Sequence, residues 1–345
     1  GAGSATVCMY NSVQLGMEDA LDPQWFNMHW SPSADLSDPD VADPVAYPSV
    51  DTWYKLLVTS PVGCGTALDS VLVNVHPSTV YGIRATADDD SICAEDPVNL
   101  HAQVEQVVRA DAFEGGPASW WTSIQGGTSS ALCGSVSGTA LYFNGAGIRS
   151  ATTGPLDFSA GGVAHFFLKI ATGSNPCDDA EPGEDVVLEY TVDGTTWILL
   201  RTLHESAFPV FSHLKVTIPA LGGSATNTQL RWRQLSNSGV GQDNWSMDNV
   251  LITRYQDDNT GLAWSPAIGV QAPNNATTSA TPAQDTWFTA TSTNTFGCSY
   301  SDSVRVTVAP AFHLLPMDDT TRCGPGGTQL QAQVASGANA TWSWS

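Results

Sequence analysis

The sequence predicts an all-β protein in which small tandem sandwich modules carry a second, larger sandwich. Thr, Ser, Val, Gly and Pro are abundant, a composition typical of short strands joined by turns. No segment shows a helical period, and an internal repeat of strand-like segments runs through the chain. The length of 345 residues fits two or three domains. No apolar run approaches the roughly 20 residues of a membrane helix, so no membrane insertion is expected.

The repeat is carried by residues 30–77 and 264–310. Each copy begins with Trp-Ser-Pro, continues through an Asp-Thr-Trp strand and reaches a Gly-Cys pair 34 residues after its first Trp (64 − 30 and 298 − 264). Apolar and polar residues alternate as strands with one buried face require, in residues 52–60, 70–76, 286–292 and 303–308. Each copy is therefore predicted to be a small β-sandwich module.

The second copy is interrupted. A Cys precedes an alternating strand at Cys8, at Cys93 and again at Cys323. Cys8 lies 22 residues before Trp30, whereas Cys93 lies 171 residues before Trp264, so about 149 residues (171 − 22) are extra. An inserted domain explains them, because insertion at a surface loop is tolerated when the ends of the insert lie close together.

These spacings divide the chain into four predicted parts. Residues 1–79 form module 1, residues 80–110 plus 255–310 form a discontinuous module 2, and residues 111–254 form the inserted domain. Residues 311–345 supply the incomplete start of a third module. Because a strand start without its sheet cannot fold alone, further chain or a neighbouring copy is expected to complete that module.

The repeats resemble the PKD-like and immunoglobulin-like (Ig-like) modules found in tandem in very large secreted surface proteins of Bacteroidetes-type bacteria. The resemblance rests on Trp-Ser-Pro, the later DTWY or DTWF segment, the Gly-Cys pair and the final DSVLVNV or DSVRVTV strand. It implies Ig-like sandwiches in an extracellular protein that is secreted or attached to the cell surface.

The inserted segment resembles the jelly-roll subrepeats of reelin and, more distantly, MAM domains and jelly-roll carbohydrate-binding modules. The matching motifs occur in order along the insert: Phe113-Glu114-Gly115, Cys133-Gly134, and the segments at 140–145, 188–197, 231–234 and 245–250. The resemblance implies a jelly-roll sandwich and leaves its ligand open.

Seven Cys in an exported chain suggest a disulfide framework. The repeat pairs Cys8 with Cys64 and Cys93 with Cys298, one bridge in each module, and leaves Cys133 with Cys177 inside the insert. Cys323 is then the unpaired residue, as an incomplete third module predicts. Zinc is the competing interpretation, but no Cys-x-x-Cys or Cys/His cluster is present.

The formal charge of −22 excludes the basic surface that nucleic acid requires and favours divalent cations held by carboxylates. The jelly-roll resemblance brings the first and last strands of the insert together, so Glu114, Asp243 and Asp248 are the candidate ligands of a structural Ca²⁺. A solvated loop with a capping Asp is the alternative. The loop at 177–185 holds five carboxylates, and it is either a cation site or a mobile acidic loop.

Aromatic side chains give a second candidate site, because their faces stack on sugar rings. The candidate residues of such a carbohydrate platform are Trp120, Trp121, Trp197 and Trp245. Packing in the core or at its rim is the alternative for each of them. No Gly-x-Ser-x-Gly or His-Glu-x-x-His motif occurs, and no catalytic residue is predicted.

We therefore expect a non-enzymatic, extracellular structural or adhesive segment of a large repeat-containing surface or filament protein. In this interpretation an Ig-like stalk displays the jelly roll, and the partners are neighbouring modules or other copies of the protein. The alternative is a carbohydrate-binding module on a spacer of Ig-like repeats, whose partner is a glycan. An exposed row of coplanar Trp favours the alternative, and Trp buried between the sheets favours the first interpretation.

Overall fold

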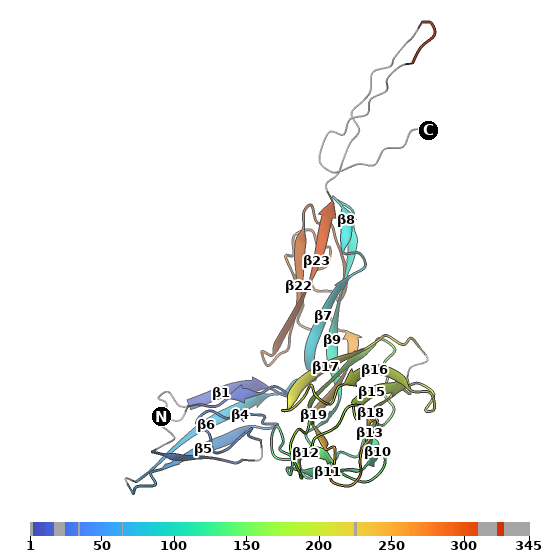
Figure 1. Ribbon diagram of the computed structural model, residues 1–345. Helices are drawn as coiled ribbons and strands as arrows, with labels where there is room; N and C mark the ends of the chain where they lie inside the picture. Colours follow the sequence, from blue (N-terminus) through green and yellow to red (C-terminus); the bar gives the residue numbers. More distant parts are fainter. Residues whose placement is uncertain are drawn as a thin grey trace. The chain divides into compact units, whose positions relative to one another are not determined.

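The computed structural model describes residues 3–16, 25–33, 35–63, 65–223, 226–309 and 323–327 (Figure 1). Every regular element in these ranges is a β-strand, which confirms the predicted all-β fold. The described ranges hold no helix of the length and apolar content needed to cross a membrane. Most of the predicted third module, residues 311–345, lies outside the described residues.

The chain divides into two compact units whose bounds differ from those of the predicted modules. Unit 1 comprises residues 1–82, 104–256 and 294–298. Unit 2 comprises residues 83–103, 257–293 and 299–345. Unit 1 thus holds the first repeat copy and the insert, and unit 2 holds most of the second copy.

The first repeat copy is a small sandwich. Its larger sheet has the order β1 (Gly3–Cys8), β6 (Thr66–His76), β5 (Thr52–Thr59) and β3 (Asn27–Ser31). A two-stranded sheet of β2 (Val13–Gln14) and β4 (Val45–Ala46) accompanies it. Alternation along β5 buries Tyr54, Leu56 and Val58, and these residues pack with Trp30 in one apolar core.

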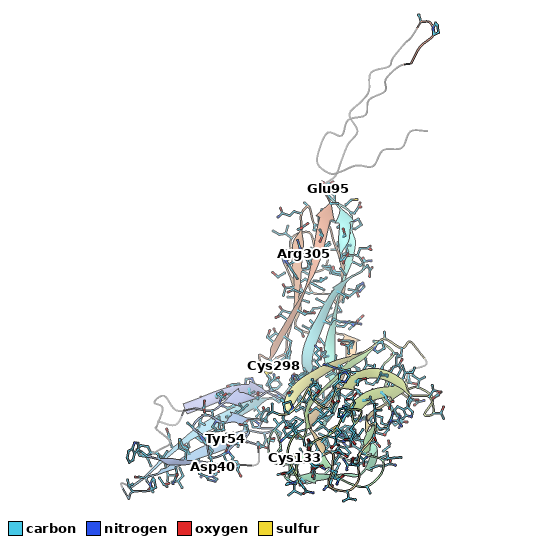
Figure 2. All side chains as sticks on the ribbon, in the orientation of Figure 1. Asp40, Tyr54, Glu95, Cys133, Cys298 and Arg305 are labelled. Carbon is cyan, nitrogen blue, oxygen red and sulfur yellow. A yellow bond between two sulfur atoms is a disulfide. The ribbon has the colours of Figure 1, made fainter. Side chains whose placement is uncertain are left out.

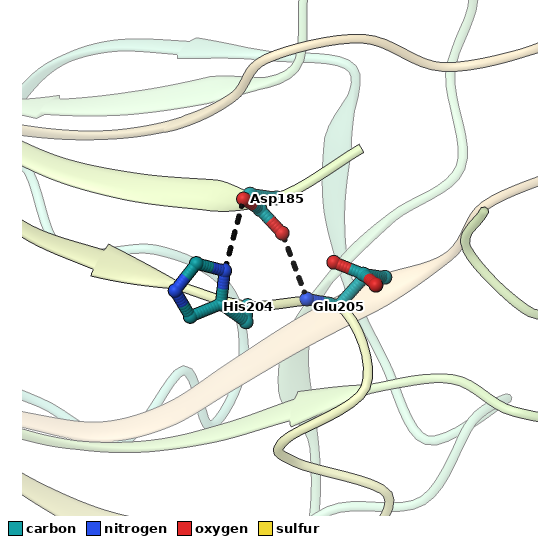
Figure 3. Close-up of side chains that lie close together, drawn as sticks. All are labelled: Asp185, His204 and Glu205. Atoms are coloured by element: carbon teal, nitrogen blue, oxygen red, sulfur yellow. Dashed lines mark hydrogen bonds and ion pairs between the residues drawn. The ribbon is translucent and has the colours of Figure 1, made fainter. Parts of the chain in front are cut away.

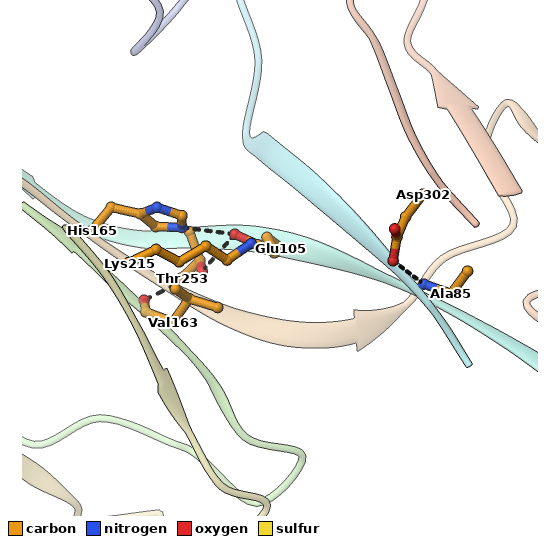
Figure 4. A network of polar contacts seen from close by, with 7 residues as sticks. All are labelled: Ala85, Glu105, Val163, His165, Lys215, Thr253 and Asp302. Carbon is orange, nitrogen blue, oxygen red and sulfur yellow. Dashed lines mark hydrogen bonds and ion pairs between the residues drawn. The ribbon is translucent and has the colours of Figure 1, made fainter. Parts of the chain in front are cut away.

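The second repeat copy is assembled from strands on both sides of the insert. One sheet has the order β20 (Leu262–Ser265), β22 (Thr286–Thr293), β23 (Ser299–Ala309) and β8 (Ser91–Cys93). Opposite it, β9 (Val98–Asp111) pairs with β21 (Thr277–Ala280) and β7 (Val80–Ala87). Asp302 on β23 accepts a hydrogen bond from the Ala85 backbone N–H of β7 at 2.8 Å, which ties strands of the two sheets together (Figure 4).

The two copies share their local structure down to single hydrogen bonds. Trp30 Nε1 donates to the carbonyl of Val41 at 3.1 Å, and Trp264 Nε1 donates to the carbonyl of Asn275 at 3.0 Å. The carboxylates of Asp51 and Asp285 each accept a backbone N–H from the last strand of their module. The residues that define the repeat therefore hold the same turns and strand ends in both copies.

The insert is a jelly roll of two sheets packed face to face. The first sheet has the order β10 (Trp121–Gln125), β13 (Ser150–Thr153), β18 (Gln229–Gln234), β15 (Val186–Thr191), β16 (Ile198–Leu203). The second has the order β11 (Gly127–Ser130), β12 (Ala140–Phe143), β19 (Trp245–Asp257), β14 (Gly162–Ile170), β17 (Ser212–Ile218). Large side chains such as Phe166, Trp232 and Trp245 fill the core between the sheets.

A buried carboxylate lies where β9 enters the jelly roll (Figure 4). Glu105 on β9 is 1 % exposed, and its two oxygens lie 2.8 Å from His165 Nε2 and 2.8 Å from Lys215 Nζ. Burial alone would raise the pKa of Glu105, but the hydrogen bonds from His165 and Lys215 outweigh it and hold the pKa below its usual value. Glu105 therefore remains ionised and holds β9 against β14 and β17.

Replacing Glu105 with Gln is expected to destabilise unit 1 at pH 7 by about 3 kcal/mol, because it removes one partner of a buried ion pair. The stabilisation by Glu105 is present above the unfolded carboxyl pKa and is lost as the pH falls through the lower folded pKa. The difference between wild type and E105Q in urea unfolding should therefore shrink towards pH 3. Asp157→Asn, whose partner Arg254 is 3.9 Å away at a half-exposed site, is the control with little effect. An equal loss at both pH values contradicts the assignment.

Candidate functional site

The outer face of the sheet that contains β10, β13 and β18 carries two rows of polar side chains. Cross-strand pairing aligns its side chains in two rows, because every second residue of a strand points to the same face. One row contains Gln125, Ser150 and Arg233, and the other contains Ser123, Thr152 and Arg231. Residues between them, such as Ala151 and Trp232, point into the core and are fully buried.

A cavity of about 730 Å³ lies over this polar face. Both rows line it, together with the loop residues Gly147, Ile148, Ser236, Asn237, Ser238 and Gly239. The volume falls within the range of small-molecule sites. Its lining supplies hydroxyl, amide and guanidinium groups, which match a ligand rich in hydroxyl or acidic groups.

One carboxylate fixes the two arginines of the polar face. Glu189 on β15 is 8 % exposed and accepts hydrogen bonds from Arg231 Nη2 at 2.7 Å and from Arg233 Nη2 at 3.0 Å. Burial raises the pKa of Glu189, but the hydrogen bonds from Arg233 and Arg231 outweigh it and keep the pKa below its usual value. The Arg231 guanidinium also lies over the Trp197 ring, 3.9 Å from its centroid. The arginines are thus held in one geometry before any ligand binds.

The four tryptophans of the predicted platform differ in exposure. Trp245 is fully buried and stacks on Phe143 with ring centroids 3.8 Å apart. Trp121 is 8 % exposed and stacks on the partly buried Trp120 at 4.3 Å. The face of Trp197 is occupied by Arg231. Trp121 and Trp245 thus lie on the core side of their strands, and one face of Trp197 lies under a guanidinium group.

Two of the three predicted Ca²⁺ ligands lie at the same loop. Asp248 on β19 is fully buried, and its Oδ2 accepts the backbone N–H of Val136 at 2.7 Å. Glu114 Oε1 accepts the backbone N–H of Thr139, from the same loop, at 3.1 Å. Gly138 has a positive φ of 46°, and any side chain there would collide with the Glu114 carboxylate.

The charges around this loop repel one another. Burial raises the pKa of Asp248 to about 7, and the neighbouring Glu114 carboxylate adds to the increase. Burial also raises the pKa of Glu114, to which the charge of Asp35 contributes. Carboxylates whose ionised forms are disfavoured in this way are suited to binding a cation, which removes the repulsion.

Asp243 belongs to a different acidic cluster. One oxygen each from Glu181, Glu184 and Asp243 lie within 4.8 Å of one another. Asp243 is 1 % exposed, and its Oδ1 has no hydrogen-bond partner among the described residues. Side-chain hydrogen bonds with Glu184 and Asp243 raise the pKa of Glu181 to about 7. The predicted triad is thus divided between two clusters, and the acidic loop 177–185 supplies ligands to the second.

A third group of possible metal ligands is Asp185, His204 and Glu205 (Figure 3). Both oxygens of Asp185 are already engaged, one by His204 Nδ1 at 3.2 Å and the other by the Glu205 backbone N–H at 3.0 Å. These contacts lower the pKa of Asp185 even though burial opposes them. The group therefore acts as a strand-end cap that joins β15 to the segment after β16.

The disulfides match the sequence prediction only inside the insert. Cys133 is bonded to Cys177 as predicted, whereas Cys8 is bonded to Cys298 (Figure 2). The predicted bridges Cys8–Cys64 and Cys93–Cys298 are therefore wrong. Cys93 is an exposed free thiol. Cys64 itself lies outside the described residues.

Strand direction explains this correction. Cys93 pairs with Ala309 at the end of β23, whereas Cys298 precedes its first residue, Ser299. At about 3.3 Å per residue, these positions are on the order of 33 Å apart, and a disulfide requires Cα atoms within about 7 Å. The first repeat copy has the same arrangement, because Cys8 lies beside His76 at the end of β6.

Comparisons with known proteins relate the insert to one family. Residues 126–253 match the family model of reelin subrepeat B, which confirms the resemblance inferred for this segment. Among solved structures, the K1 cleaved adhesin domain of Lys-gingipain from Porphyromonas gingivalis W83 has 17 % identity and a TM-score of 0.32. The match covers 42 % of this chain and 96 % of that chain.

Two further solved structures are similar at the same level. The K3 cleaved adhesin domain of the same Porphyromonas gingivalis protein has 15 % identity and a TM-score of 0.33, with 44 % of this chain and 99 % of that chain covered. A family 16 carbohydrate-binding module has 10 % identity and a TM-score of 0.29, with 41 % of this chain and 99 % of that chain covered.

The polar-face residues Arg231, Arg233 and Glu189 are not among the site residues predicted from the sequence. They lie in the segments at 188–197 and 231–234, whose motifs predict the jelly roll. The sequence does contain a pattern that indicates this face, since two arginines flank a Trp in residues 231–233. On a sandwich strand this alternation places both arginines on the solvent face.

Burial predicts losses of stability of different size for two of the tryptophans. Trp245→Ala should destabilise the jelly roll by about 3–5 kcal/mol, because it leaves a cavity in the core. Trp197→Ala should cost only about 0.5–1 kcal/mol, the energy of an exposed cation–π contact. Urea unfolding followed by circular dichroism measures both, and equal losses would contradict the assignment of Trp245 to the core and Trp197 to the surface.

Proposed function

We propose that this chain is an exported, non-catalytic adhesive segment of a large repeat-containing surface or filament protein. Ig-like modules of the PKD-like kind carry the jelly roll, and the polar face of the jelly roll is the contact surface. The observation that carries the proposal is the pre-set pair Arg231 and Arg233 beneath a polar cavity. Groups held in place before binding lose little conformational freedom when a partner arrives.

Two further features support the proposal, one its extracellular location and the other its adhesive role. The two disulfides are typical of proteins that fold in an oxidising compartment. The withdrawal of Trp121 and Trp245 into the core favours the adhesive interpretation over a sugar-stacking platform. The partners in this proposal are surface molecules with acidic or hydroxyl groups, together with neighbouring modules or copies of the protein.

Ca²⁺ is proposed as the structural cofactor. Glu114 and Asp248 would hold one ion with backbone carbonyls, and Asp243 with Glu181 and Glu184 would hold a second. The hard carboxylate oxygens of both clusters fit this ion. In each place the ion would replace carboxylate repulsion with attraction.

A carbohydrate-binding module is the second candidate function. The specific observation in its favour is the hydroxyl and amide lining of the cavity, which includes Ser150, Thr152 and Asn237. Sugars bound there would be recognised by hydrogen bonds rather than by ring stacking. Both candidate functions thus use the same face and differ in the ligand.

Replacing Arg233 with Ala is expected to weaken adhesion by about tenfold or more, since a charge-assisted hydrogen bond contributes about 1.5–3 kcal/mol. The measurement is binding of the full chain to immobilised mucin before and after enzymatic deglycosylation. Arg305→Ala, at an exposed arginine in unit 2, is the matched control. Loss of binding on deglycosylation assigns the carbohydrate function, and retention assigns protein adhesion. If R233A binds as well as wild type, the polar face is not the contact surface.

Millimolar Ca²⁺ is expected to raise the melting temperature by several degrees, because an ion at 100 times its Kd adds about 2.7 kcal/mol. The pKa of Asp248 is raised to about 7, so below that pH its carboxyl group is protonated. The protonated group stabilises the folded protein in the absence of Ca²⁺. That stabilisation is lost as the pH rises through about 7. The Ca²⁺ effect should therefore be larger at pH 8 than at pH 5.

Variants separate the two cation sites. Asp248→Asn and Asp243→Asn should each remove part of the Ca²⁺-dependent rise, and the double variant should remove all of it. Asp285→Asn, at an exposed carboxylate in unit 2, should leave the rise unchanged. Differential scanning calorimetry with Ca²⁺ or EDTA makes the comparison, and a full rise in the double variant would refute both sites.

A further inference from the structure

The cavity over the polar face is a basic site in a strongly acidic protein. The chain carries 34 Asp and Glu against 12 Lys and Arg. Arg231 and Arg233 nevertheless line this cavity together, and none of its described lining residues is Asp or Glu. Among the described residues, Glu189 is the one carboxylate that pairs with either arginine. Two guanidinium charges against one carboxylate leave one positive charge unbalanced (2 − 1) beside the cavity.

Each arginine holds Glu189 with one edge of its guanidinium group. Arg231 donates from Nε at 3.0 Å and from Nη2 at 2.7 Å, and Arg233 donates from Nε at 3.3 Å and from Nη2 at 3.0 Å. The two side chains are 22 % and 29 % exposed. Their Nη1 atoms make no hydrogen bond to a described residue and are not buried, so these N–H groups are available to a ligand.

The geometry of the two arginines matches a planar anion with one charge. A guanidinium group presents its N–H groups in one plane, which fits the two oxygens of a carboxylate. Arg231 and Arg233 are two residues apart on β18, so they lie on the same face of the strand at a spacing of about 7 Å. A carboxylate placed over them would complete the charge balance that Glu189 begins (2 − 2).

The rest of the lining matches a hydroxylated ring. Ser150 and Thr152 on β13 extend the two rows of polar side chains into the cavity. Ile148 and Leu235 line the same cavity and are 65 % and 46 % exposed. A sugar ring carries hydroxyl groups at its edge and C–H groups on its faces, so both kinds of lining have a counterpart in it. An acidic protein side chain has no hydroxyl groups to match Ser150 and Thr152.

We propose that the polar face binds a carboxylated sugar, a uronic acid or sialic acid unit of a surface glycan. The sugar carboxylate accepts hydrogen bonds from the Nη1 groups of Arg231 and Arg233. The ring hydroxyls bind Ser150 and Thr152, and the C–H face of the ring packs against Ile148. This inference rests on the function proposed for the polar face and specifies its ligand.

The test is binding of the full chain to matched acidic and neutral glycans, measured by isothermal titration calorimetry. One pair is oligogalacturonate and its methyl ester, and the other is sialyllactose and lactose. The acidic member of at least one pair should bind more tightly by about tenfold or more, because it adds charge-assisted hydrogen bonds. The pair that shows the difference identifies the source of the carboxylate. Added salt should weaken binding of the acidic member only, since salt screens the charge pairing.

Variants separate recognition of the charge from recognition of the ring. Arg233→Gln should abolish the preference for the acidic glycan, because the side chain stays polar but loses its charge. Ile148→Ser should weaken both members of a pair equally, because it removes contact with the ring. Arg305→Ala, at an exposed arginine in unit 2, is the control and should change neither affinity. Thermal unfolding followed by circular dichroism shows whether each variant is folded.

The outcomes distinguish this ligand from the proposed contact surface itself. Equal affinity for the acidic and neutral members of both pairs, or no binding of any of these glycans, overturns the carboxylated sugar. Tighter binding of polyglutamate than of either acidic glycan also overturns it and assigns the face to an acidic protein partner. The contact surface is tested separately by R233A on mucin, so either proposal can fail while the other stands.

Discussion

The whole arrangement depends on one pair of strands that carries the chain into and out of the jelly roll. Strand β9 enters the insert, β19 leaves it, and the two pair with each other. This satisfies the geometric condition for an insertion, since the two ends of the insert are adjacent strands. Glu105 on β9 stabilises the same place by binding His165 on β14 and Lys215 on β17. The two ends of the jelly-roll segment are therefore neighbouring strands.

The chemistry of the jelly roll follows from the alternation of its strands. Inward positions of β18 carry Leu230 and Trp232 into the core, so Arg231 and Arg233 necessarily face solvent. Glu189 then accepts hydrogen bonds from both guanidinium groups and orients them across the strand pair. The same sheet that buries the aromatic residues thus forms the polar face, which is why one surface serves both candidate functions.

The fold class and the repeat were accessible from the sequence because both rest on local patterns. Alternation, turn residues and the Trp30 and Trp264 motifs depend on nearby residues, and the structure repeats them with the same hydrogen bonds. The disulfides were not accessible, because spacing along the chain does not say at which end of a sandwich a Cys lies. Parallel pairing of β1 with β6 places Cys8 at the end opposite to the one expected. Likewise, Asp243 and Asp248 are close in sequence, but only the three-dimensional arrangement separates their clusters.

The Cys8–Cys298 bridge has a mechanical consequence. It closes a covalent ring over a sequence separation of 290 residues, and the jelly roll lies entirely inside that ring. A pulling force applied to the chain outside the ring passes through the two sulfur atoms and bypasses the jelly roll. Fully extended, the enclosed segment would span on the order of 1000 Å. This length cannot be released by tension while the bridge is intact.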